Sequence, residues 1–79
     1  MILFRVTING YKEDGCPVQK TFERDYHRDY IEKIMYMTED AFRLHIAEHA
    51  DEIADWLCEK EDIMFEGIEK YETIKYEED

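Results

Sequence analysis

Apolar residues recur at helical spacing through the second half of the chain. Five of them fall within a narrow arc when successive residues are placed about 100° apart: Phe42, Ile46, Ala50, Ile53 and Leu57. Thr38 is a suitable N-cap, and Glu39 and Asp40 follow it where the helix dipole favours negative charge. The pattern therefore predicts a helix from Thr38 to about Lys60.

A cleanly alternating run at the N-terminus predicts a strand with one buried face. Every even-numbered residue from Ile2 to Ile8 is apolar. The letters KEDGCP then supply turn chemistry, and a second strand is expected at about Val18 to Phe22. A three-residue loop, Glu13 to Gly15, would pair Phe22 with Val6 and keep both on the buried side, whereas a two-residue loop would move Phe22 to the other side.

Two further segments complete the expected fold. The letters ERDYHRDYIEKIMYM place Tyr26 one turn before Tyr30 and favour a short helix, although the β-forming residues near its end leave a strand open. Alternating apolar residues predict a last strand at about Ile68 to Tyr76, with Gly67 as a bulge or loop. The order is β-β-α-α-β, which makes residues 1–79 a single α+β domain. Its small antiparallel sheet, the N-terminal hairpin plus the C-terminal strand, packs against one long and one short helix.

The excess of negative charge lies wholly in the second half of the chain. Residues 1–37 hold six acidic and six basic residues, whereas residues 38–79 hold fifteen acidic and four basic ones, and the net charge is −11. Such an asymmetry indicates interaction with a positively charged partner. It argues against direct binding to nucleic acid or to an anionic membrane.

The remaining composition predicts a cytoplasmic protein without a cofactor. No apolar run approaches the roughly 18 residues of a membrane span, and the letters MILFRVTING lack the basic-then-apolar order of a signal peptide. Cys16 and Cys58 have the spacing of neither a disulfide framework nor a metal knuckle, so both are expected to be reduced thiols.

The letters HIAEH, at residues 45–49, raise the alternative of a zinc site. His45 and His49 lie one helical turn apart, and Glu48 between them could act as a general base. In these five letters the chain resembles the inverted zincins, which implies a zinc hydrolase. That family also needs a glutamate ligand on a separate helix and a large enclosing chamber, for which a chain of 79 residues has no room. Glu52 would only extend the same helical line. Imidazoles at the border of the core, bonded to nearby carboxylates, are therefore the favoured interpretation, with no metal and no catalytic residue.

Carboxylates form a stripe on the same predicted helix. Five of them lie within about 100° of arc and along about 16 Å of helix axis: Glu48, Asp51, Glu52, Asp55 and Glu59. Their like-charged pairs at i,i+3 or i,i+4 cost on the order of 1 to 2.5 kcal/mol before screening, and no base lies within the stripe. A solvated face that serves solubility is the simpler interpretation. The favoured one is a surface that docks into a basic groove, formed by Glu48, Asp51, Glu52, Asp55, Glu59, Glu61, Asp62 and Trp56.

A small chain with an acidic second half and scattered Tyr and Trp residues resembles the phage-encoded inhibitors that imitate DNA, the anti-CRISPR and anti-restriction proteins. The resemblance is one of type and rests on no shared motif. It implies a non-enzymatic inhibitor that occupies the basic nucleic-acid groove of a CRISPR complex or restriction enzyme in a bacterial host. The aromatic candidates for contact are Tyr26, Tyr30, Trp56, Tyr71 and Tyr76. An antitoxin-like or other regulatory interaction module is the alternative, followed by the zinc hydrolase.

Overall fold

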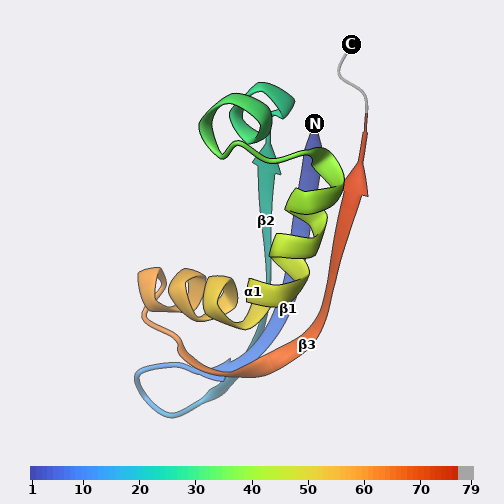
Figure 1. Cartoon of the computed structure of the whole chain (residues 1–79). Coiled ribbons are helices and arrows are strands. Elements are labelled where there is room, and N and C mark those ends of the chain that lie inside the picture. Colours follow the sequence, from blue (N-terminus) through green and yellow to red (C-terminus); the bar gives the residue numbers. More distant parts are fainter. Residues whose placement is uncertain (77–79) are drawn as a thin grey trace.

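The computed structural model describes residues 1–76, which form a three-stranded antiparallel sheet with helices over one face (Figure 1). The predicted α+β fold and its element order are confirmed. The sheet has the order β2-β1-β3, so the N-terminal strand lies in the middle. The elements are β1 (Ile2–Tyr11), β2 (Pro17–Tyr26), the short π-helix η1 (Tyr30–Ile34), α1 (Glu39–Lys60) and β3 (Met64–Lys75).

The core lies between the helix-facing side of β1 and the buried face of α1. The even-numbered β1 side chains from Ile2 to Ile8 are at most 2% exposed, as the alternation predicts. Ile31 of η1 closes the core at one end. On α1 the buried residues are Phe42, Ile46, Ala50, Ala54, Leu57 and Cys58.

The hairpin has the register that the three-residue loop predicts. Val6 is opposite Phe22 and Ile8 is opposite Lys20. The Lys12 N–H donates to the Cys16 carbonyl at 2.9 Å and so closes the loop Glu13–Gly15. The strand β2 continues to Tyr26, four residues beyond its predicted end, because its pairing with β1 extends to Ile2.

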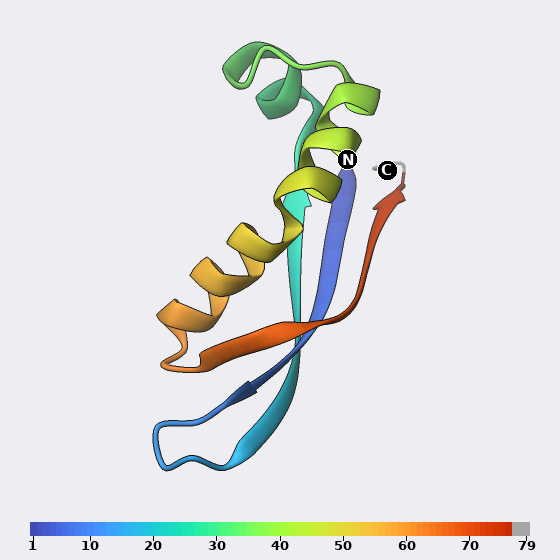
Figure 2. The ribbon, with the colours of Figure 1, turned by 60° about the horizontal axis from the view of Figure 1, so that its bottom comes forward.

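The helix α1 begins where the sequence predicts and bends in the middle. The Thr38 hydroxyl accepts a hydrogen bond from the Ala41 N–H at 3.2 Å, which confirms the N-cap. His49 has non-helical backbone angles, φ −113° and ψ 16°. Near this residue the helix changes direction, from a first half along β1 to a second half that turns toward β2 (Figures 1 and 2). The predicted apolar residues Phe42, Ile46, Ala50 and Leu57 are buried, and Ile53 is half-buried against the core. Ala54 and Cys58, which lie outside the predicted arc, are fully buried as well.

The strand β3 begins at Met64, four residues before its predicted start, and pairs with β1 to Lys75. Its register shifts opposite Thr7/Ile8 and again opposite Asn9/Gly10. Gly67 lies between these two irregularities, which fits its prediction as a bulge position.

Gly10 lies where β1 meets the start of β3. A Cβ atom on Gly10 would overlap the Met64 carbonyl oxygen and lie 2.8 Å from Cγ2 of Ile63. The backbone of β3 can therefore approach β1 here only because residue 10 has no side chain.

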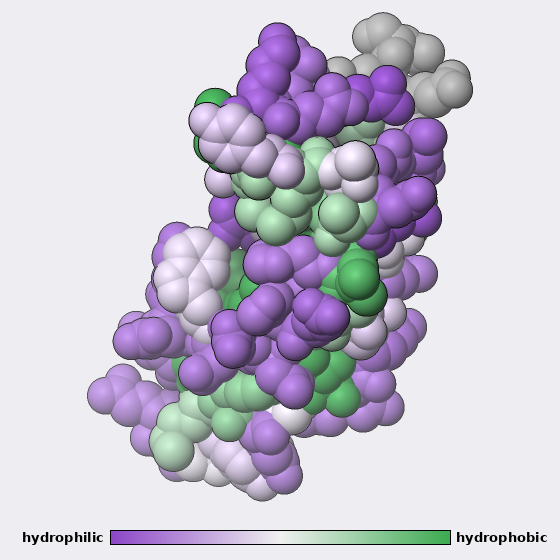
Figure 3. Space-filling view, viewed as in Figure 1, coloured by the Kyte–Doolittle hydropathy of each residue, from purple (hydrophilic) through white to green (hydrophobic). Residues whose placement is uncertain are grey.

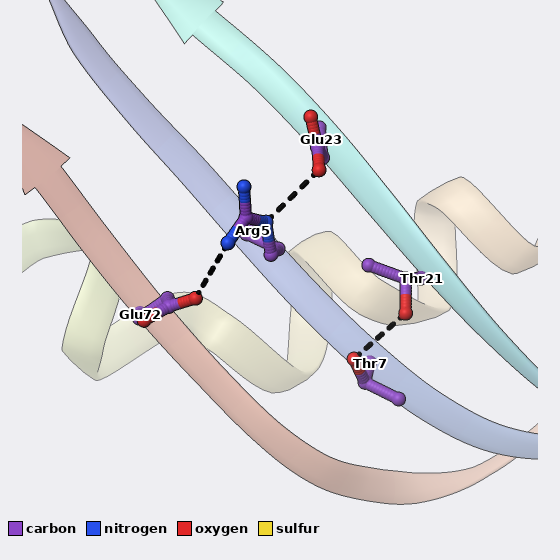
Figure 4. A network of polar contacts seen from close by, with 5 residues as sticks. All are labelled: Arg5, Thr7, Thr21, Glu23 and Glu72. Atoms are coloured by element: carbon purple, nitrogen blue, oxygen red, sulfur yellow. Dashed lines mark hydrogen bonds and ion pairs between the residues drawn. The ribbon is translucent and has the colours of Figure 1, made fainter.

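The face of the sheet opposite the helices is polar, and an arginine joins its three strands (Figure 4). The Arg5 guanidinium donates from Nε to Glu23 Oε1 at 2.9 Å and from Nη1 to Glu72 Oε1 at 3.0 Å. The hydrogen bond to Glu23, followed by that to Glu72, raises the pKa of Arg5. One row further along, the hydroxyls of Thr7 and Thr21 are 2.9 Å apart. Cross-strand pairs of this kind stabilise the register of the sheet.

The substitution Gly10→Ala is expected to lower the free energy of unfolding by about 1 to 3 kcal/mol, because the added methyl group forces β3 away from β1. Urea denaturation measures the change. Gly67→Ala is the matched control: an added Cβ there meets nothing within 4 Å, so the stability should change by less than about 0.5 kcal/mol. Equal effects of the two substitutions would contradict the close approach at Gly10.

Candidate functional site

All eight residues predicted to contact a partner are exposed on α1 or on the turn that follows it. The bend at His49 lies between Glu48 and the other predicted residues. The second half of α1 holds Asp51, Asp55 and Glu59 on one line, with about 6 Å between neighbours. We call these three residues together with Glu52 the carboxylate row. The space-filling view from the helix-covered side shows a mainly hydrophilic surface interrupted by separate apolar areas (Figure 3).

Most of these carboxylates lack an ionic partner. Within residues 1–76, no cationic nitrogen lies within 4 Å of Glu48, Asp51, Asp55, Glu59 or Asp62. Two of the predicted contact residues do have a partner. Glu61 forms an ion pair with Lys20 of β2 at 3.1 Å, and Glu52 Oε2 lies 3.2 Å from Nδ1 of His49.

The two ends of α1 are tied to opposite edge strands of the sheet. At its start, the Glu39 carboxylate lies 3.5 Å from the Lys75 ammonium of β3 and 3.8 Å from the Arg28 guanidinium. Just past its end, Glu61 pairs with Lys20 of β2. The helix thus crosses the sheet diagonally, and its second half presents the carboxylate row beside β2.

Trp56 lies within this region, but its neighbours are cations. Its side chain is 44% exposed. The Lys60 ammonium is 3.8 Å from the ring centroid, and the Arg24 guanidinium carbon is 5.2 Å from it. Sequence reasoning missed Arg24 because it ended β2 at Phe22. The alternation Phe22, Arg24, Tyr26 was the available signal, since it places all three on the helix-covered side of a longer strand.

The other candidate aromatic residues have different surroundings. Tyr26 is half-buried and packs edge-on against Phe42, with the ring centroids 4.8 Å apart, so it belongs to the core. The Tyr76 hydroxyl donates to Asp25 at 2.7 Å. Tyr30 and Tyr71 are 46% and 44% exposed, but neither lies on α1.

The two histidines of the HIAEH letters face each other at the bend of the helix. The ring centroids of His45 and His49 are 4.6 Å apart, and His49 also contacts Glu52. In the part of the chain that the structure describes, no group of three or more His, Cys, Asp or Glu side chains is arranged to hold a metal ion. Both imidazoles are half-buried at the border of the core, and His49 is bonded to a carboxylate, as the favoured interpretation predicts for the pair.

The two cysteines are free thiols in different environments. Cys16 is exposed at the hairpin loop, whereas Cys58 is buried in the core. Burial raises the pKa of the Cys58 thiol, and the neighbouring Asp55 carboxylate raises it further.

Comparison of the chain with protein-family models, with curated proteins and with solved structures found no match. Among residues 1–76, no helix combines the length and the apolar character needed to cross a membrane.

Asp55 is the centre of the repulsion within the carboxylate row. Its like-charged neighbours at i,i+3 or i,i+4 are Asp51, Glu52 and Glu59. The substitution Asp55→Asn removes all three unfavourable pairs and should raise the free energy of unfolding by about 1 kcal/mol at low ionic strength. Thermal denaturation with increasing salt measures the gain, which should shrink as the charges are screened. Asp40→Asn, in the favourable first turn of α1, is the control and should bring no gain.

Thiol labelling tests the packing of the second half of α1. At neutral pH we expect one thiol of the folded protein to react rapidly with a disulfide reagent, and the second to react only after denaturation, because Cys58 is inaccessible and held as the thiol. Cys16→Ser should abolish the rapid phase, and Cys58→Ser should preserve it. Rapid labelling of both thiols in the folded protein would contradict the burial of this half of the helix.

Proposed function

We propose that this protein is a non-enzymatic inhibitor that docks its carboxylate row into the basic groove of a nucleic-acid-binding protein or complex. Defence nucleases of bacteria, such as a CRISPR effector or a restriction enzyme, are the class that we infer. The observation that carries the proposal is the set of exposed carboxylates on the second half of α1 that lack an ionic partner.

Mutual repulsion makes this arrangement unfavourable in the isolated protein. Three like-charged pairs converge on Asp55, at about 0.2 to 0.5 kcal/mol for each pair. A domain of this size has a core that supplies only about 3 to 5 kcal/mol of net stability. Binding to a cationic surface would convert the repulsion into attraction, which gives the unpaired carboxylates a physical role.

The spacing of the carboxylate row supports docking into a groove that normally binds a phosphate backbone. Asp51, Asp55 and Glu59 repeat one negative charge about every 6 Å along the second half of α1. Because both ends of α1 are held by ion pairs to edge strands, the row is presented as a preorganised line. Preorganisation lowers the entropic cost of association.

The test begins with recovery of the partner from a bacterial lysate by the tagged protein. We expect a nucleic-acid-binding protein, and we expect DNA or RNA bound by that partner to compete with the inhibitor. The affinity should fall steeply between about 50 and 200 mM salt, since the contacts are ionic. Recovery of a small basic toxin, with no competition by nucleic acid, would instead support an antitoxin.

The triple substitution Asp51→Asn, Asp55→Asn and Glu59→Gln should weaken binding to the recovered partner at least about tenfold. Loss of the fold would not explain this result, because the same substitutions relieve repulsion in the free protein. The matched control changes the same net charge at three exposed acids elsewhere: Glu13→Gln, Glu32→Gln and Glu66→Gln. Equal weakening by the two triple variants would indicate a general charge effect, and unchanged binding of the first would remove the carboxylate row from the interface.

A further inference from the structure

Two cations share the ring of Trp56 at the edge of the carboxylate row. The Lys60 ammonium lies 3.8 Å from the ring centroid, within the range of a cation–π interaction, and the Arg24 guanidinium carbon lies at 5.2 Å. They come from different elements, α1 and β2. We call Arg24, Trp56 and Lys60 the cation–aromatic patch.

Neither cation of the patch has an acidic partner. Within residues 1–76, no carboxylate oxygen lies within 4 Å of the charged nitrogens of Arg24 or Lys60. Lys60 nevertheless lies between Glu59 and Glu61 in the sequence, and Glu61 is paired with Lys20 instead. Two positive charges therefore stay available beside a row of negative ones.

A surface that carries both the carboxylate row and two cations that are unpaired within residues 1–76 does not match a uniformly basic groove. Such a groove would attract the carboxylate row and repel Arg24 and Lys60, and like charges brought together across an interface are strongly unfavourable. A nucleic acid or an anionic membrane would be repelled by the carboxylate row itself. The surface as a whole therefore fits a protein that carries both signs of charge.

Building on the proposed function, we propose that the partner's basic groove is bordered by a carboxylate, and that Arg24 and Lys60 are the residues that pair with it. The carboxylate row supplies attraction to the groove, and the cation–aromatic patch fixes the orientation in which the helix enters it. Trp56 supplies a large, partly exposed ring beside both charges. Trp and Arg are among the residue types most enriched at positions that dominate interface energies. The patch would also distinguish this partner from other basic proteins.

The experiment compares two cationic binding partners: the protein recovered from the lysate and poly-L-lysine, which has no carboxylate side chains. Arg24→Glu with Lys60→Glu should weaken binding to the recovered partner about tenfold and tighten binding to poly-L-lysine. Lys12→Glu with Lys33→Glu makes the same charge change at exposed residues outside the patch. This control should bind poly-L-lysine more tightly and should not weaken binding to the recovered partner.

Tighter binding of the Arg24 and Lys60 variant to both partners would overturn the inference, because it would mean that the groove is uniformly basic. Unchanged binding to the recovered partner would overturn it as well. The single substitution Lys60→Gln removes one charge without adding a carboxylate to the last turn of α1, and so guards against a folding defect: it should keep the fold and still weaken binding to the recovered partner. If the triple carboxylate variant binds normally, the proposed function itself fails. If only the patch variants bind normally, this inference fails alone.

Discussion

Both edges of β1 are hydrogen-bonded to neighbouring strands, and one whole face of β1 is buried. Because β1 is central, the C-terminal strand β3 must return from the far end of α1 to pair with it. The polypeptide between β2 and β3 is therefore confined to one face of the sheet, where η1 and α1 cover the apolar side chains from Ile2 to Ile8. The other face needs no cover, since Arg5 and the threonine pair make it polar.

The bend at His49 determines where the helix that covers the core places its charged side chains on the surface. The first half of α1 follows β1 and is tied to β3 through Glu39 and Lys75. The second half turns toward β2, which brings Trp56 next to Arg24 and the carboxylate row to the rim of the sheet. A straight helix with the same sequence would distribute these groups differently around the molecule. The charge pattern on which both proposals rest is thus a product of tertiary structure.

Local sequence patterns predicted most of the fold. The alternation in β1, the N-cap Thr38 and the loop at Gly15 act through neighbouring residues, and the structure confirms all three. The length of β2, the bend at His49 and the ion pair from Lys20 to Glu61 depend on contacts between segments far apart in the chain, and these were missed. The exposure of the carboxylates could be predicted from helical phase, whereas the cations on Trp56 could not, because Arg24 reaches it from another strand.

The two register shifts in β3 also affect how the edge of the sheet can contact other molecules. An outer strand normally offers a regular series of free amide and carbonyl groups, to which a strand of another molecule can add. The irregularities on either side of Gly67 interrupt that series midway along β3. Neighbouring molecules therefore meet no long, flat template on this side, which protects a small and highly charged domain from self-assembly into extended sheets at high concentration.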